Sequence, residues 1–425
     1  MNQLQMMDFM PVAAVVEQHV EEATVLRNIR SRVVQAAHVK LRHLRMLDER
    51  LDAHLDGLGV AATYGAELAA AALDRPGRGE AFTAVVRAIE SRDAVELDKL
   101  LALSEALPAC RAGVISAFGW VSAGSLRGIT TVLLQSPNRL RRVIGLAACA
   151  MHQVDPGAAI EIALEDAEPA LRARALRVVA DRGQVVHLPK CLNALADGDF
   201  SCVGAAVRAC VLLGDRHQSI EALDSIAAAP GPWQEEALGL TLKVHTPLAT
   251  HEVLKSLLKY PSNMRLVIKG IGFAGDPRYV PWLIRQMQDL QFARLAGESF
   301  SFITGLDLAD LNLDRNLPED ADLVPTYDPN DEDVAMDEDD GLPWPDPVII
   351  DAWWQANGHR FTPSKRYFMG EPPSFAHCVD VLKTGFQRQR NSAAVYLCLL
   401  NPGTPLFNTA APAWRQERWL NAMSA

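Results

Sequence analysis

Glycines that end amphipathic stretches recur at a regular spacing along the middle of this chain. They are Gly183, Gly214, Gly275 and Gly305, separated by 31, 61 and 30 residues, so the longest interval holds two units. Glycine takes up the left-handed conformation that ends many helices, and each unit has room for two short helices. One such hairpin cannot bury its apolar face alone, whereas a row of stacked hairpins can. The spacing therefore predicts an array of helical hairpins.

One unit shows the pattern in detail. Asp166 is placed to cap a helix that begins near Pro169, where a proline loses no hydrogen bond. An apolar stripe follows at helical spacing, made of Leu171, Ala175, Val178 and Val179. Upstream, Ala109 to Trp120 is predicted to pair with a second helix, Leu126 to Leu134. No segment sustains the alternation of a strand, so we expect an all-α fold without a sheet.

Hairpins that start with Asp-x5-Arg, as Asp166 and Arg172 do, resemble HEAT repeats. The unit of about 31 residues is shorter than the usual ~40–47 and resembles the short HEAT-like repeats of the phycobilisome-lyase type. The predicted fold is an α-solenoid of HEAT-like helical hairpins with a helical N-terminal cap. The cap is expected to use a leucine stripe made of Leu47, Leu51, Leu55 and Leu58.

Four segments are predicted along the 425 residues. They are an N-terminal helical cap (1–75), a HEAT-like repeat array (76–306), an acidic disordered insertion (307–346) and a C-terminal helical segment that continues or caps the array (347–425). The insertion holds fifteen Asp or Glu and one basic residue, Arg315. Such a composition buries too little apolar surface to offset the entropy of ordering, so we expect a loop or disorder there.

Charge and targeting signals narrow the class of protein. The net charge is −11 and the insertion alone supplies −14, so the remainder is near +3. A near-neutral body does not favour nucleic-acid binding, which needs a basic face. We expect no signal peptide, no membrane span and a cytoplasmic location. The seven cysteines contain no CxxC and most of them fall in apolar helical patterns, so buried, reduced thiols are predicted.

Catalytic and metal-binding patterns are absent from the sequence. There is no P-loop, no dinucleotide fingerprint, no nucleophile elbow and no HExxH. His251-Glu252 is the single His-Glu pair, whereas iron-binding HEAT-like hydroxylases use several. The acidic run Asp337-Glu338-Asp339-Asp340 lacks the glycine and terminal glutamate of an EF-hand. We therefore predict no catalytic residues, no metal and no cofactor, and an acidic strap that is either solvated or a lure for a basic partner.

Large aromatic rings next to this strap are the best candidates for partner binding, because such rings are enriched at binding hot spots. Packing between repeats is the alternative role for each ring. A recurring arginine stripe, which includes Arg139, Arg141, Arg142 and Arg172, is expected to form ion pairs between repeats. The predicted partner-binding residues are Trp344, Trp353, Trp354, Tyr367, Asp337, Glu338, Asp339 and Asp340.

Three stretches resemble an uncharacterised proteobacterial family of HEAT-repeat proteins. They are residues 47–58 (Leu-Asp-Glu-Arg-Leu-Asp-Ala-His-Leu-Asp-Gly-Leu), 385–390 (Gly-Phe-Gln-Arg-Gln-Arg, then Ala393 and Ala394) and 411–416 (Ala-Pro-Ala-Trp-Arg-Gln). Members of that family are associated with type VI secretion gene clusters. The resemblance implies an adaptor or co-chaperone that helps to load a secretion effector, and it carries over no catalytic residue.

We therefore expect a non-enzymatic scaffold that binds proteins along its groove, the partner being a secretion effector or its chaperone. One alternative is a HEAT-like enzyme, lyase-like or DNA-glycosylase-like, which requires a deep pocket with converging polar groups. A second alternative is a structural assembly subunit, which requires self-association.

Overall fold

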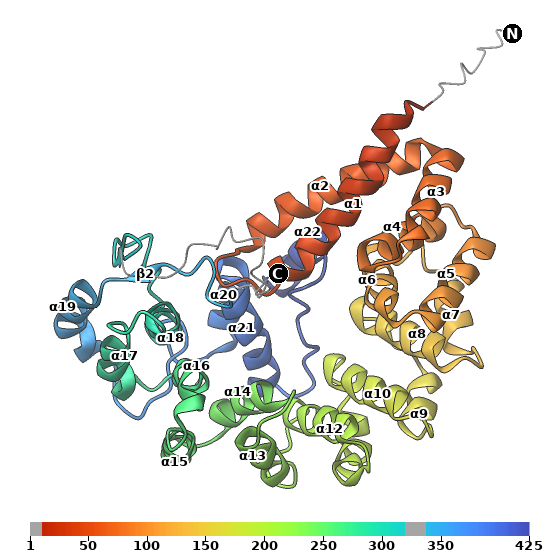
Figure 1. Ribbon diagram of the computed structural model, residues 1–425. Coiled ribbons are helices and arrows are strands. Elements are labelled where there is room, and N and C mark those ends of the chain that lie inside the picture. The colour runs from red at the N-terminus through yellow and green to blue at the C-terminus, as the bar shows by residue number, and fades with distance from the viewer. Residues whose placement is uncertain (1–10, 319–336, 425) are drawn as a thin grey trace, which may run out of the picture. The chain divides into compact units, whose positions relative to one another are not determined.

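Helices account for nearly all regular structure in the computed structural model, which describes residues 11–318 and 337–424. Those residues form 22 α-helices, so the predicted all-α class is confirmed (Figure 1). The expectation of no sheet is wrong in one place. Strands β1 (Asp314–Arg315) and β2 (Trp344–Pro345) pair antiparallel, and two-residue strands are too short to leave an alternating pattern.

The described chain divides into two units, and neither is continuous in sequence. The first unit contains residues 11–35, 41–178 and 410–424, and the second contains residues 36–40 and 179–409. The four segments predicted from the sequence follow chain order, and their boundaries stay a prediction.

Helices that alternate along the chain pack side by side in the first unit. α1 packs on α2 and α4, α4 on α6, and α6 on α8. Its helices are α1 (Ala13–Val33), α2 (Leu41–Val60), α3 (Ala62–Ala71), α4 (Arg78–Glu90), α5 (Ala94–Ala106), α6 (Arg111–Trp120), α7 (Ile129–Leu134), α8 (Arg139–Met151), α9 (Ala158–Leu164), most of α10 (Pro169–Asp181) and α22 (Ala413–Ser424). The leucine stripe of α2 faces the core, with Leu51, Leu55 and Leu58 at most 2% exposed.

The second unit repeats this packing, with α12 on α14, α14 on α16 and α16 on α18. Its helices are α11 (Leu188–Asn193), α12 (Phe200–Leu212), α13 (Ile220–Ala228), α14 (Gln234–Val244), α15 (Pro247–Leu257), α16 (Met264–Ala274), α17 (Val280–Gln286), α18 (Ala293–Thr304), α19 (Pro347–Asn357), α20 (Phe375–Thr384) and α21 (Gln387–Leu400). Short 3-10 helices are Ala72–Asp74, Pro108–Cys110, Val185–His187, Ala194–Ala196, Pro261–Asn263, Pro277–Tyr279 and Gly358–Arg360.

The predicted helix-ending glycines have positive φ values, and a later part of the chain runs against them. Gly275 ends α16 at φ 68° and Gly305 ends α18 at φ 75°. A Cβ on Gly275 would lie 2.0 Å from the carbonyl oxygen of Tyr367, whose amide donates to the Gly275 carbonyl at 2.8 Å. A Cβ on Gly305 would lie 2.5 Å from the Met369 oxygen. Both glycines therefore provide a turn and a close backbone approach.

Each unit also uses one C-terminal arginine to bind the free carbonyls at a helix end. In the first unit Arg415 is 4% exposed and donates to Gly119 at 2.7 Å and Val121 at 2.9 Å, at the end of α6. In the second unit Arg366 donates to Leu242 at 2.7 Å and Lys243 at 2.6 Å, at the end of α14. These bonds satisfy carbonyls that have no partner within their helix.

In the described residues no single helix is long and apolar enough to cross a membrane; Ala94–Ala106 with Pro108–Trp120 reaches that length only as a pair bent by 118°. All seven cysteines lie in the described residues, where they are buried and form no disulfide, as the sequence predicts.

Candidate functional site

The aromatic residues predicted to bind a partner pack mostly within the second unit. Tyr367 is 6% exposed, and its ring lies 5.1 Å from that of Phe361. Trp354 lies 5.6 Å from the same Phe361 ring, and Trp353 meets Phe300 of α18 edge-on at 6.1 Å. Both tryptophans are half-buried. Packing of α19 on its neighbours therefore accounts for much of their surface.

Trp344 lies in β2, in register with Arg315 of β1. The guanidinium carbon of Arg294 lies 4.8 Å from the centroid of the Trp344 ring, which is a cation–π contact. The ring is half-buried and lies a few residues after the acidic run. The β1–β2 ribbon therefore brings one predicted ring next to a cation that also binds the acidic residues.

Asp339 is the buried member of the acidic run, at 2% exposure. Its carboxylate accepts hydrogen bonds from both terminal nitrogens of Arg265 at 2.9 and 2.7 Å. Arg294 donates to the main-chain oxygen of Asp339 at 3.1 Å and also pairs with the carboxylate of Asp337. A bidentate pair of this kind fixes both position and orientation.

Glu338 lies at the outside of the same cluster, with its side chain 65% exposed. Its carboxylate is 3.4 Å from the Lys269 ammonium and 3.6 Å from Arg265. Attraction to Lys269 lowers the pKa of Glu338, against the opposing effect of burial. Arg388 donates to the main-chain oxygen of Glu338 at 2.5 Å, and Asp340 is exposed.

The described flanks of the acidic segment, 307–318 and 337–346, are turns and loop around the two-residue strands β1 and β2, which fits the expected loop, and the disorder predicted for 307–346 stays a prediction. Residues 319–336 lie outside the described residues. Asp307 pairs with Lys40 at 3.1 Å, and the run from Asp337 pairs with helices α16, α18 and α21. The composition of the segment shows its low apolar content, but it cannot show these ion pairs, because their cations belong to helices that are distant in the sequence.

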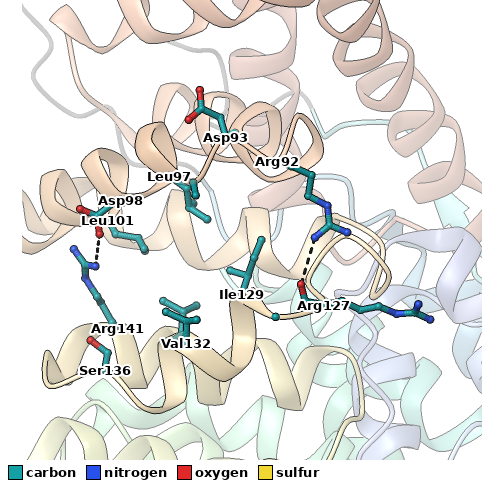
Figure 2. Close-up of a pocket in the computed structure, with 14 residues that line it drawn as sticks. Arg92, Asp93, Leu97, Asp98, Leu101, Arg127, Ile129, Val132, Ser136 and Arg141 are labelled. Atoms are coloured by element: carbon teal, nitrogen blue, oxygen red, sulfur yellow. Dashed lines mark hydrogen bonds and ion pairs between the residues drawn. The ribbon is translucent and has the colours of Figure 1, made fainter.

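A separate cavity lies in the first unit, between α5 and α7. Its volume is about 280 Å³. Figure 2 shows Leu97 and Leu101 of α5 facing Ile129 and Val132 of α7 across it. Leu97 and Leu101 are buried, whereas Val132 is 69% exposed at the mouth. The cavity exists because α7 has six residues and α5 has thirteen, so α7 covers only part of α5.

Charged residues surround this cavity without filling it. Arg141 donates to Glu105 at 2.7 Å and to Asp98 at 2.5 Å. Arg92 donates to the main-chain oxygen of Arg127 at 3.3 Å (Figure 2) and to that of Gly124 at 2.9 Å. The Arg127 side chain is exposed and has no ion-pair partner among the described residues. The cavity therefore combines apolar walls with two cations, Arg92 and Arg127, for which no ion pair is found among the described residues.

The predicted arginine stripe forms ion pairs between repeats, as expected. Arg142 lies 3.0 Å from the carboxylate of Asp166, and Arg139 lies 3.4 Å from Glu168. Arg172 donates to the main-chain oxygen of Asp166 at 2.8 Å, at the start of its own helix α10, and the contact of Asp166 with the neighbouring helix α8 is made by Arg142.

Sequence reasoning missed a buried amine in the second unit. Lys243 is 8% exposed, with its Nζ 4.2 Å from the centroid of Phe273 and 5.6 Å from that of Tyr396. Burial, with repulsion from Arg366, lowers the pKa of Lys243 to about 7. Lys243 follows an apolar run in α14, and this position was the one signal that could have shown its burial. Among the described residues, no three His, Cys, Asp or Glu side chains converge as metal ligands.

Comparison with known proteins identifies no family for this chain. No family model matches it, and no curated protein matches it. Among solved structures it is similar to the crystal structure of an engineered protein, at 12% sequence identity and a TM-score of 0.31, over 91% of this chain and 99% of that chain. A similarity this low carries no argument about fold or function.

Proposed function

We propose that this chain is an α-solenoid of HEAT-like hairpins and acts as a non-enzymatic scaffold for a protein partner. The packing of α4 on α6 on α8, and of α14 on α16 on α18, supports a row of stacked hairpins. The contacts of Asp166 with Arg142 and Arg172 support HEAT-like repeats. The resemblance to proteins of type VI secretion gene clusters supports a cytoplasmic role as an adaptor or co-chaperone for a secretion effector.

The cavity between α5 and α7 carries this proposal. Its walls are apolar, and it is open at Val132, a combination that suits an apolar side chain of a partner polypeptide. The exposed cation of Arg127 beside it suits a carboxylate next to that side chain. Its polar neighbours do not converge on one point, since Asp98 is paired with Arg141 and Arg92 binds main-chain oxygens. That arrangement favours binding over the enzymatic alternative.

Affinity purification from cells of the native host tests this function, with the substitution Val132→Asp. We expect the wild-type chain to retain a specific protein at physiological salt. The variant should retain at least about tenfold less of that protein, because the substitution buries a charge in the apolar contact. Val348→Asp is the matched control, since Val348 is also a highly exposed valine, at 78%, on α19. Equal recovery by both variants, or no protein recovered by the wild type, would contradict the proposal.

A further inference from the structure

Four cations from three helices of the second unit converge on one short acidic stretch. Arg265 and Lys269 come from α16, Arg294 from α18 and Arg388 from α21. Their side chains are 34%, 16%, 11% and 26% exposed, so the helices hold each one in place. We call these four residues the basic surface.

The basic surface has more positive charge than its own helices neutralise. Lys269 pairs with Glu235 at 3.0 Å and Arg388 pairs with Glu298 at 2.8 Å. No such partner from the helices is found among the described residues for Arg265 or Arg294, whose ion pairs go to residues 337–339. Two positive charges are therefore left for an acidic ligand.

The contacts to that ligand are those of peptide recognition. Arg265 holds the Asp339 carboxylate through two hydrogen bonds, while Arg294 and Arg388 donate to the main-chain oxygens of Asp339 and Glu338. Main-chain and side-chain contacts of this kind depend on the conformation of three residues and not on their covalent link to the helices. Arginine forks suit this task because they bind carboxylates in two directions at once.

The acidic residues themselves form a turn that a separate peptide could adopt. The Asp339 amide donates to the Asp337 side chain at 2.9 Å, and the Asp340 amide donates to the Asp337 carbonyl at 3.1 Å. Asp337 and Glu338 have side chains 41% and 65% exposed, so the turn lies at the outside of the basic surface. Exchange with a competing ligand therefore starts at these two exposed side chains, and it is complete only when the Asp339 side chain, 4% exposed, leaves Arg265.

We propose that the basic surface is a binding site for an acidic peptide segment of a partner protein, occupied in this chain by residues 337–339. The partner segment has the pattern Asp-Glu-Asp and forms the same turn. The chain's own acidic run is then an internal competitor, which keeps the site closed until a partner segment with additional contacts displaces it. This site is separate from the cavity between α5 and α7, and its test does not depend on that cavity.

Binding of a labelled peptide, Asp-Glu-Asp-Asp-Gly-Leu (the sequence of residues 337–342), tests the proposal by fluorescence anisotropy. The full-length protein is compared with the variant Asp337→Asn, Glu338→Gln, Asp339→Asn. An internal segment competes at an effective concentration on the order of 1 mM, so we expect the variant to bind the peptide at least about tenfold more tightly than the wild type. The affinity should fall as salt rises from about 50 to about 300 mM.

Two controls make the result specific. Adding Arg265→Gln to the triple variant should abolish the gain, and the peptide Asn-Gln-Asn-Asn-Gly-Leu should not bind. A folded triple variant that binds the acidic peptide no better than the wild type would overturn the proposal. So would binding that is unaffected by Arg265→Gln.

A second measurement covers the case in which the triple variant does not fold. Hydrogen exchange of the wild-type chain should accelerate at the amides of Asp339 and Asp340 when the peptide is added in excess. Both amides bond to Asp337 within the turn, and a displaced turn that Arg265, Arg294 and Arg388 no longer hold opens more often. Unchanged exchange at saturating peptide would overturn the proposal. A wild-type dimer that Arg265→Gln converts to monomer would also overturn it, in favour of a second copy of this chain as the source of the acidic segment.

Discussion

The two units are built from similarly packed helices, yet one has an open cavity and the other has a basic surface that its own chain covers. In the first unit the cavity between α5 and α7 is open, and Arg127 beside it has no ion-pair partner among the described residues. In the second unit the basic surface is covered by residues 337–339, and Asp339 is 2% exposed. The comparison shows that packed helices of the same kind can leave an apolar cavity open in one unit and hold a distant acidic segment against their cations in the other.

The largest expected difference in stability is between two glycine substitutions, one at a position that another part of the chain covers and one at an open position. Gly275 and Gly128 both have positive φ, at 68° and 82°, but only Gly275 faces another backbone. A Cβ at Gly275 would lie 2.0 Å from the Tyr367 oxygen, whereas nothing lies within 4 Å of one at Gly128. We expect Gly275→Ala to lower the free energy of unfolding by about 3 kcal/mol or more, and Gly128→Ala by about 1 kcal/mol.

Urea denaturation of both variants would check this difference. Equal losses of stability would contradict the prediction. They would mean that the positive φ of Gly275 alone causes the loss, and that the segment around Tyr367 moves away from α16 to make room for the new Cβ.

Removing a cation should have the next largest effect, and again only in the second unit. Arg265→Met leaves the Asp339 carboxylate, with a side chain 4% exposed, without its partner. Loss of one partner of a buried pair costs roughly 3–5 kcal/mol, and the partial exposure of Arg265 reduces this to about 2–3 kcal/mol. Arg141→Met in the first unit should cost less, about 1 kcal/mol, because its partners Asp98 and Glu105 have side chains 65% and 29% exposed and stay accessible to water.

The double variant Arg265→Met, Asp339→Asn provides the control for that prediction. It should be more stable than Arg265→Met alone, because it no longer buries an unpaired charge. Thermal unfolding of the wild type, Arg265→Met, Asp339→Asn and the double variant would measure the coupling between the two side chains. A double variant no more stable than Arg265→Met would count against a buried ion pair.

The sequence predicted the elements of both units better than their contacts. The glycines at 275 and 305 were predicted as helix ends from local spacing, because a left-handed residue is a local requirement. Their second role could not be predicted, since the carbonyls of Tyr367 and Met369 approach from a much later part of the chain. The same limit applies to Asp339, whose partner Arg265 lies 74 residues earlier.

The cavity was missed for a different reason. The stretch from Leu126 to Leu134 was predicted as one helix, but α7 begins only at Ile129, after Gly128 at φ 82°. A helix of the predicted length would have covered more of α5. Element boundaries are the least certain part of a prediction from sequence patterns, and the shift of three residues shortens the helix that faces α5 across the cavity.

Acid should affect the two units unequally, and this is the smallest of the expected effects. His152 of the first unit is half-buried, and its ring lies 2.7 Å from the Phe118 carbonyl oxygen. Burial, with repulsion from Arg415, lowers the pKa of His152 to about 4. In the unfolded chain His152 binds a proton below about pH 6.5, whereas in the folded chain it binds one only below about pH 4. Stability therefore falls as pH falls from about 6.5 to 4.

The buried amine of the second unit titrates in a higher window. Because the pKa of Lys243 is lowered to about 7, its contribution to stability falls between about pH 10.5 and 7 and then changes little in acid. From pH 7 to 5 we expect His152 to cost the first unit about 1–2 kcal/mol and Lys243 to cost the second much less than that. Hydrogen exchange of core amides in α8 and α14, corrected for intrinsic rates, would measure both. His152→Gln should remove most of the acid sensitivity of α8; if the variant keeps it, another group of the first unit takes up the proton.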